Sequence, residues 1–194
     1  MKAKINSIAL FGTSADPPTL GHEAILNELT ENFPKVITWA SDNPDKKHQI
    51  PLLKRTQLLR ILVQKISHPK LELVQELSSP RTIHSIKKAL QLWPEANFSF
   101  VIGSDLAAQV PKWLNAKSIL DKAKIAIAER DGWPICEKQL DVIKQLGGEI
   151  EILPFKIPES SSSEFRERPQ KILVPQEIVP LLLEENLYGL TDNR

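Results

Sequence analysis

The sequence predicts an α/β fold built on a doubly wound parallel sheet of about five to six strands, with helices on both faces. Two observations lead to this prediction. Short apolar runs of strand length alternate along the chain with longer segments whose apolar residues recur at helical spacing. Each apolar run stops at a glycine or in a polar loop, as strands do at the edge of a sheet. Such alternation favours parallel strands joined by right-handed crossovers, an arrangement described as Rossmann-like.

Six segments are predicted to be strands, because each is a short run of mainly apolar residues, several of them β-branched. In chain order they are residues 5–11, 36–40, 71–74, 98–102, 124–128 and 150–153. The first ends at Gly12 and the fourth at Gly103. A glycine therefore marks the exit of two strands.

The helices are predicted from apolar residues that recur three and four positions apart. The first begins near Gly21, and the others span roughly residues 52–66, 82–92, 135–146, 162–168 and 176–185. The helix at 82–92 cannot continue through Pro94, since proline lacks a backbone donor and clashes with the preceding turn. We expect one domain, residues 1–194, with a small helical part at its C-terminal end from about residue 160.

Composition excludes several classes of function. The chain of 194 residues is 41% hydrophobic and 25% charged, as is usual for a globular protein, and its net charge of +1 gives no general attraction to nucleic acid or a membrane. No apolar run approaches the length of a membrane span. Cys136 is the single cysteine, so neither an internal disulfide nor a cysteine-based metal site is expected. A cytoplasmic location follows as an expectation, with no nucleic acid or membrane partner.

The loop after the first strand is the first place to look for a site, because open parallel sheets bind ligands at the carboxyl ends of their strands. Residues 12–22 read Gly-Thr-Ser-Ala-Asp-Pro-Pro-Thr-Leu-Gly-His, without the glycine patterns of dinucleotide-binding or P-loop proteins. Gly12 leaves room for a phosphate. Gly21 and His22 open a helix, whose free N–H groups attract anions. Thr19 lies three residues before His22 and can face the same way.

This loop resembles the nucleotidyltransferase superfamily marked by His/Thr-x-Gly-His, and within it the bacterial nicotinate mononucleotide adenylyltransferases. Their loop typically reads Gly-x-x-Phe-Asp-Pro-x-His-x-Gly-His. His22 alone would be read as an ordinary helix residue, but five positions match in register: Gly12, Asp16, Pro17, Gly21 and His22. The chain departs from the pattern at Ala15 and at Thr19. A threonine at the second of these positions occurs in sister branches, such as the phosphopantetheine adenylyltransferases.

A second matching segment lies about 140 residues further on. Residues 161–166, Ser-Ser-Ser-Glu-Phe-Arg, resemble the family's Ile-Ser-Ser-Thr-x-Ile-Arg. Alone, this stretch would be read as a serine linker before a solvated helix. A serine before a helix is an N-cap, however, and an arginine one turn into the helix completes an anion site. The resemblance places the ATP phosphates at Ser162, Ser163 and Arg166.

A third segment, residues 100–105, resembles the family's Ile-Gly-x-Asp sequence, which lies against adenine and ribose. The resemblance assigns Ile102, Gly103 and Asp105 to ATP. A tryptophan at the position of Trp113 stacks on the pyridine ring in the family, although an indole there is as readily a core anchor.

Weaker matches concern the acceptor. Residues 43–46 resemble the family's Asn-Pro-x-Lys loop, and residues 130–132 its Arg-Pro-Gly. Where the family often reads Tyr-Thr-x-Asp-Thr-Leu, the chain has Thr82 in register but Arg81 and His84 as departures. The acceptor-binding residues expected from these matches are Asp16, Lys46, Thr82, Trp113 and Arg130.

The resemblance, which runs from about residue 8 to 188, implies transfer of AMP from ATP to nicotinate mononucleotide, giving nicotinate adenine dinucleotide and pyrophosphate in NAD biosynthesis. The nucleophile is a phosphate oxygen that is largely ionised at neutral pH, so no general base is needed. The expected catalytic residues are His22, Thr19 and Arg166. Gly12, Thr13, Ser14 and Gly21 join His22 in the expected ATP site. Mg²⁺ would be bound mainly through ATP phosphates and water, and no protein metal ligand is expected.

Two alternatives remain. The protein could be an adenylyl- or cytidylyltransferase for another phosphate acceptor, such as nicotinamide mononucleotide, phosphopantetheine or a phosphocholine-like alcohol, and Thr19 favours this alternative. A nucleotide-binding module without catalysis is the other alternative, against which an intact His22 and Arg166 argue. The partners expected are ATP and a pyridine mononucleotide, and the sequence is compatible with a homo-oligomer.

Overall fold

The centre of the fold is a parallel sheet of six strands in the order β3-β2-β1-β4-β5-β6, in a computed structural model that describes residues 7–158 and 161–191. The strands are β1 (Ser7–Thr13), β2 (Val36–Ala40), β3 (Leu71–Leu73), β4 (Asn97–Gly103), β5 (Ala123–Arg130) and β6 (Ile150–Ile157). Every neighbouring pair is parallel. The order reverses between β1 and β4, which makes the sheet doubly wound and confirms the predicted fold.

Seven α-helices and five short 3₁₀ helices surround this sheet in the described ranges. The α-helices are α1 (Leu20–Asn32), α2 (Leu52–Ile66), α3 (Thr82–Leu92), α4 (Ala116–Leu120), α5 (Glu137–Gln145), α6 (Ser162–Glu167) and α7 (Val179–Glu184). The 3₁₀ helices are η1 (Gln75–Leu77), η2 (Ser104–Lys112), η3 (Lys171–Leu173), η4 (Gln176–Ile178) and η5 (Leu187–Gly189).

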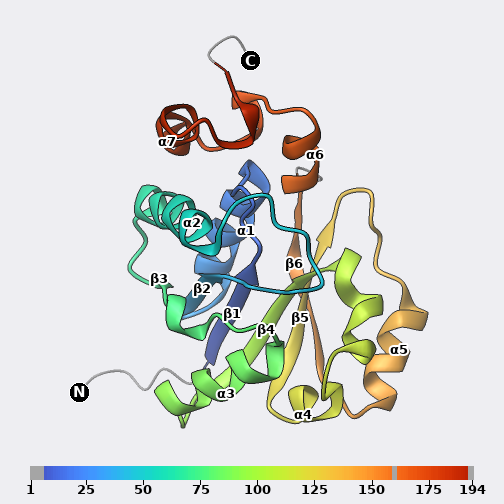
Figure 1. Cartoon of the computed structure of the whole chain (residues 1–194). Helices are drawn as coiled ribbons and strands as arrows, with labels where there is room; N and C mark the ends of the chain where they lie inside the picture. The colour runs from blue at the N-terminus through green and yellow to red at the C-terminus, as the bar shows by residue number, and fades with distance from the viewer. Residues whose placement is uncertain (1–6, 159–160, 192–194) are drawn as a thin grey trace.

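Two hydrophobic cores cover the two faces of the sheet (Figure 1). Side chains alternate between faces along a strand, so Ile8 and Leu10 of β1 belong to one core and Ala9 and Phe11 to the other. The first core contains residues of α3, η2, α4 and α5, and the second contains residues of α1 and α2. Helices on both faces were predicted, and this prediction is confirmed.

The C-terminal helices form a third, smaller core against α2. Phe165, Leu182 and Tyr188 pack there with Leu58 of α2, and all four are buried. The rings of Phe165 and Tyr188 meet edge to face, with centroids 5.7 Å apart. Figure 1 shows α6 and α7 together at the top of the molecule, beyond α1 and α2. The expected single domain stays a prediction.

The ends of two strands differ from the prediction. Residues 5 and 6 of the first predicted strand lie outside the described residues, and β1 continues through Gly12 to Thr13. Strand β6 runs to Ile157 rather than stopping at residue 153. It is an edge strand, where Pro154 is tolerated although it cannot donate to a ladder. The ladder between β5 and β6 shifts register at the same point.

The helices differ from the prediction in two ways: some were not predicted, and others have different ends. The sequence did not predict η2 and α4, which fill the stretch between β4 and β5. The predicted helix at 135–146 begins at Glu137, and the one at 176–185 is divided into η4 and α7. Among the described residues, no helix combines the length and the apolar character needed to cross a membrane.

Candidate active site

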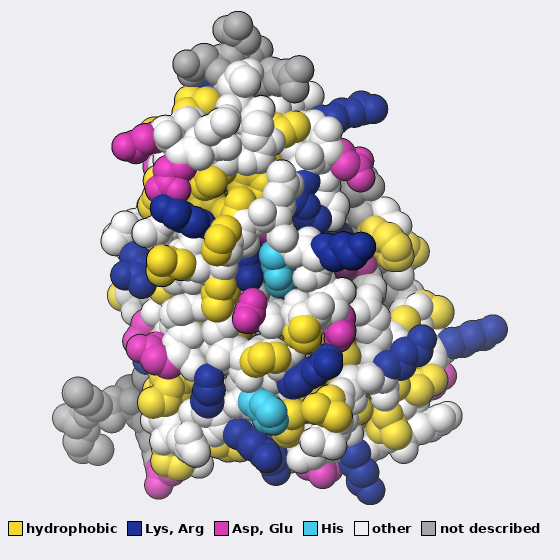
Figure 2. Space-filling model, in the orientation of Figure 1, with side chains coloured by type: hydrophobic (Ala, Val, Ile, Leu, Met, Phe, Trp, Pro, Cys, Tyr) yellow, Lys and Arg dark blue, Asp and Glu magenta, His cyan; other side chains and the backbone are white. Residues whose placement is uncertain are grey.

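A cavity of about 650 Å³ opens at the carboxyl ends of the strands, next to the point where the strand order reverses. Its walls come from the loop after β1, the loop after β2, the start of α3, the β4–η2 segment and the start of α6. Figure 2 shows Lys and Arg side chains around a histidine near the middle of one face of the molecule. All predicted site residues line the cavity except Thr19.

His22 is held by the first turn of its own helix. Its Nδ1 lies 3.0 Å from the backbone nitrogen of Thr19 and 3.0 Å from Thr19 Oγ1. A backbone N–H can only donate, so Nδ1 accepts, and the proton of the neutral ring is on Nε2. Nε2 lies 2.8 Å from Thr13 Oγ1 at the end of β1. The N–H of the imidazole is thereby directed toward the cavity end of the strand.

The environment keeps this imidazole neutral. Burial, followed by the positive charges of Arg130 and Lys46, lowers the pKa of His22 from 6.5 to about 4. At neutral pH the ring therefore offers one fixed hydrogen-bond donor and no charge. This state suits the positioning of a phosphate oxygen.

Thr19 does not line the cavity. Its side chain is fully buried, and it precedes α1 as the N-cap residue. The catalytic role of Thr19 stays a prediction, and in the structure its contacts with Nδ1 orient His22. Ala15, the other departure from the family pattern in this loop, is also fully buried outside the cavity and has a positive φ of 46°.

Gly12 is required by packing. A Cβ at this position would lie 2.6 Å from Cζ2 of Trp39, whose side chain is 2% exposed. Gly12 faces Trp39 directly in the β1–β2 register. Gly12 also lines the cavity, and its role beside a phosphate stays a prediction. The constraint at Gly103 is weaker, because a Cβ there would meet the end of the flexible Asp105 side chain, which can move aside.

The late serine–arginine segment contacts the first loop directly. Ser162 Oγ donates to the carbonyl oxygen of Pro17 at 2.8 Å. Arg166 Nη1 donates to the carbonyl oxygen of Asp16 at 2.8 Å, and its Nη2 to Ser163 Oγ at 3.0 Å. The two segments that the sequence placed in one site therefore form one wall of the cavity.

Asp16 is committed to contacts within the protein. Its side chain is 1% exposed. Oδ2 accepts from the backbone nitrogen of Gln49 at 2.8 Å, and Oδ1 accepts from the hydroxyl of Tyr188 at 2.7 Å. Burial, then the hydrogen bond to Asp16, raises the pKa of Tyr188 well above its usual range, so the hydroxyl keeps its proton. This carboxylate joins the first loop to the C-terminal segment, and the substrate-binding role of Asp16, which lines the cavity, stays a prediction.

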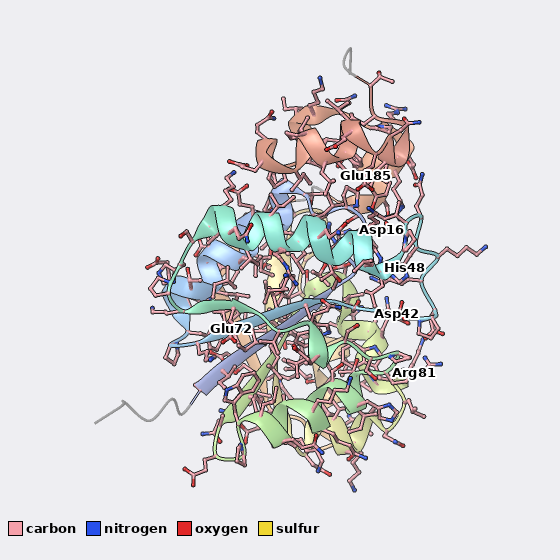
Figure 3. The ribbon with its side chains drawn as sticks, turned by 60° about the vertical axis from the view of Figure 1, so that its left-hand side comes forward. Asp16, Asp42, His48, Glu72, Arg81 and Glu185 are labelled. Atoms are coloured by element: carbon pink, nitrogen blue, oxygen red, sulfur yellow. The ribbon has the colours of Figure 1, made fainter. Side chains whose placement is uncertain are left out.

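Sequence reasoning missed Arg55, which joins two walls of the cavity. This side chain of α2 is 1% exposed, and its Nη1 donates to the carbonyl oxygens of Ser14 and Ser41, each at 2.7 Å. Figure 3 shows Asp16, Asp42 and His48 on the side of the molecule where these loops meet. Nothing in the sequence distinguishes Arg55 from the other basic residues of α2, which are Lys54, Arg60 and Lys65.

The opposite wall carries Arg130 and Asp105. Arg130 Nη1 lies 3.3 Å from Asp105 Oδ2. The backbone nitrogen of Arg130 donates to Ser104 Oγ at 3.0 Å, which ties the end of β5 to the end of β4. Lys46 lines the cavity from the loop after β2. Lys46, Arg130 and Arg166 are three of the cationic side chains that line the cavity, and they come from three different segments.

The remaining wall suits a flat ring. Trp113 is half-buried and meets Phe100 edge to face, with centroids 5.8 Å apart and planes at 78°. It is both a core contact and part of the cavity lining. Thr82, the first residue of α3, lines the cavity with Arg81, whereas His84 is exposed and outside it.

No group of three or more His, Cys, Asp or Glu residues in the described part of the chain is arranged to hold a metal ion. Asp16 and Asp105, two of the carboxylates that line the cavity, have protein partners.

Comparison with known proteins agrees with this geometry. The Cytidylyltransferase-like family matches residues 10–168. A probable nicotinate-nucleotide adenylyltransferase of Synechocystis is 34% identical, over 93% of this chain and 98% of the relative. One of Geobacillus thermodenitrificans is 28% identical, over 95% and 87%. The structure of Plasmodium falciparum nicotinic acid mononucleotide adenylyltransferase complexed with NaAD superposes with a TM-score of 0.79 at 22% identity, covering 96% of this chain and 98% of that one.

The fold, the cavity and these matches define the class: the protein is a nucleotidyltransferase of the Cytidylyltransferase-like family. Within that class, the chain belongs to the nicotinate-nucleotide adenylyltransferases, as the Synechocystis relative shows over nearly its full length.

Proposed function

We propose that this protein transfers AMP from ATP to nicotinate mononucleotide, giving nicotinate adenine dinucleotide and pyrophosphate. The observation that carries the proposal is a neutral His22, its N–H fixed on Nε2, in a cavity that also holds Lys46, Arg130 and Arg166. The names of the Synechocystis and Plasmodium falciparum relatives support the choice of acceptor.

The reaction needs positioning and fixed positive potential rather than a base. An oxygen of the acceptor phosphate attacks the α-phosphorus of ATP, and the bond from that phosphorus to the pyrophosphate oxygen breaks. His22 Nε2, which lies 2.8 Å from Thr13 Oγ1, donates instead to an oxygen of the phosphate that is transferred once the substrate is bound. Arg166, with Ser162 and Ser163, binds the β- and γ-phosphates, where the negative charge of the leaving group develops.

The nucleoside part of ATP lies on the ends of β1 and β4. The backbone from Gly12 to Ser14 and the start of α1 at Gly21 border the phosphates. Ile102 and Gly103 lie against the adenosine, and the carboxylate of Asp105 accepts from ribose hydroxyls.

When bound to ATP, Mg²⁺ would neutralise part of the charge on the phosphates. Asp16 is engaged by Gln49 and Tyr188, and Asp105 by Arg130. The oxygens around the ion therefore come mainly from phosphate and water, as is usual for Mg²⁺.

The acceptor occupies the other half of the cavity. Trp113 offers a flat face for the pyridine ring, and Thr82 borders that ring from α3. Lys46 and Arg130 provide positive charge for the acceptor phosphate. Thr19, whose resemblance to sister branches favoured a different acceptor, is buried and does not line the cavity.

The test is an acceptor panel. The protein is incubated with ATP and Mg²⁺ and, separately, with nicotinate mononucleotide, nicotinamide mononucleotide and phosphopantetheine, and pyrophosphate release is measured. We expect the highest kcat/KM with nicotinate mononucleotide. No release with any of the three would contradict adenylyl transfer, and a preference for phosphopantetheine would contradict the acceptor.

A further inference from the structure

Arg81 lines the cavity at the start of α3, where the sequence departs from the family pattern. Its Nη1 lies 2.6 Å from Oδ2 of Asp45, which lines the cavity from the loop after β2. The two side chains are 40% and 68% exposed. Figure 3 shows Arg81 on the same side of the molecule as Asp42 and His48 of that loop. The pair thus closes the cavity between α3 and the loop.

Arg81 lies apart from the cations that surround His22. The charges of Arg130 and Lys46 act on His22, and those of Arg166 and Arg130 act on Lys46. Arg81 contributes to neither group. It borders the cavity beside Thr82 and Ser85, and Trp113 lines the same cavity. A positive charge therefore lines the same cavity as Thr82 and Trp113, and it is not among the charges that act on His22 or Lys46.

The chemistry of a guanidinium indicates what it would bind there. Arginine presents five donors in a planar fork that matches a carboxylate with two parallel hydrogen bonds. An exposed ion pair such as Arg81–Asp45 is worth little, so an incoming carboxylate can replace or share it. A carboxamide carries no charge and presents an NH₂ group to one arm of the fork.

We infer that Arg81 is a specificity-determining residue that pairs with the carboxylate of the pyridine ring and so selects the acid over the amide, with Asp45 as its competitor in the empty cavity. This inference rests on the proposed function, because it concerns the acceptor of the same reaction. The preference for the carboxylate over the carboxamide then depends on one side chain rather than on the cavity as a whole.

The first experiment compares wild type with Arg81→Gln. With saturating ATP and Mg²⁺, kcat/KM is measured for nicotinate and for nicotinamide mononucleotide, and the dissociation constant of each is measured by calorimetry. Losing a charged hydrogen-bond partner should lower the acid-to-amide ratio by about tenfold or more. Arg81→Lys should restore only part of the ratio, because a point charge cannot pair bidentately. His84→Gln, at an exposed neighbour outside the cavity, is the matched control and should leave the ratio unchanged.

The second experiment uses the competitor. Asp45→Asn removes the carboxylate that holds Arg81, so the acid-to-amide ratio should rise, by roughly twofold to fivefold for so exposed a pair. In the double variant Asp45→Asn/Arg81→Gln, the ratio should match that of Arg81→Gln. Opposite shifts in two single variants of one ion pair do not arise from loss of folding.

Three outcomes would overturn the inference. Arg81→Gln could weaken both mononucleotides equally, which would mean that Arg81 binds their shared phosphate or ribose. The ratio could stay unchanged in a variant that still binds both. Asp45→Asn could lower the ratio. If wild type transfers AMP to neither mononucleotide, the proposed function fails, and the calorimetric ratio still decides the role of Arg81.

Discussion

The third residue of α1 is a histidine in a position where a capping box usually has Glu or Gln. His22 takes up the backbone N–H of Thr19, which would otherwise lack a partner within the helix. The same bond fixes the ring's orientation and its tautomer. One local contact of a helix start therefore sets the chemical state of the side chain that we place on the transferred phosphate.

The lowered pKa of His22 predicts a pH dependence of stability. The unfolded chain binds a proton at this site below about pH 6.5, whereas the folded chain binds it only near pH 4. The contribution of neutral His22 to the free energy of unfolding is therefore fully present above pH 6.5 and is lost as the pH falls toward 4. The free energy of unfolding of wild type, minus that of His22→Gln, should therefore decrease between pH 7 and pH 4.5, as chemical denaturation can measure. His48, whose pKa is also lowered, is present in both proteins. A difference that is independent of pH would contradict the buried, neutral imidazole.

Gly12 gives a second test at the scale of one residue. In Gly12→Ala the new methyl group would overlap the indole of Trp39, so we expect a loss of about 1–3 kcal/mol in the free energy of unfolding. The control is the same substitution in a Trp39→Phe background, where the smaller ring leaves room and the loss should shrink. An equal loss in both backgrounds would mean that Trp39 is not the cause.

At the scale of elements, the site depends on segments far apart in the chain. The first loop is held from α6 through Ser162 and Arg166, from the loop after β2 through Gln49, and from η5 through Tyr188. Both oxygens of Asp16 take part in this arrangement. The C-terminal helices therefore do more than cover α2, because they fix the loop that carries His22.

Tyr188→Phe tests this connection. The ring can keep its contact with Phe165, but Oδ1 of buried Asp16 loses its hydroxyl donor. We expect a loss of about 1–3 kcal/mol in the free energy of unfolding. We also expect a lower kcat/KM, because the backbone carbonyl of Asp16 accepts a hydrogen bond from Arg166. Wild-type stability together with wild-type kinetics would show that the C-terminal segment does not position the loop.

At the scale of the whole molecule, the sequence was most informative where periodicity extends over a whole element. The helix at 52–66 was predicted to the residue, since its apolar spacing extends over 15 residues. The strand at 36–40 was also predicted to the residue, because it is one mainly apolar run that ends in a polar loop. The stretch 104–120 was missed because η2 contains Pro111 and α4 has five residues, too few to show a period. Strand β6 was predicted too short because edge position, which permits Pro154, is a property of the sheet.

The cavity lining was largely predictable and the supporting contacts were not. Residues in register with the family pattern, such as Lys46 and Arg166, do line the cavity. Asp16 matched the same pattern, yet its carboxylate faces the protein, because its partners are distant in sequence. No sequence pattern predicts the role of Arg55, because the carbonyl groups to which it donates belong to residues far away in the sequence.

The central claim is that His22 acts as a fixed, neutral donor to the phosphate that is transferred. The most direct measurement is kcat for the formation of nicotinate adenine dinucleotide by wild type and by His22→Ala, with saturating ATP, Mg²⁺ and nicotinate mononucleotide. Loss of a donor to the transition state predicts a fall of about 10²-fold or more in a variant that remains folded. A folded His22→Ala protein with near-normal kcat would contradict the account.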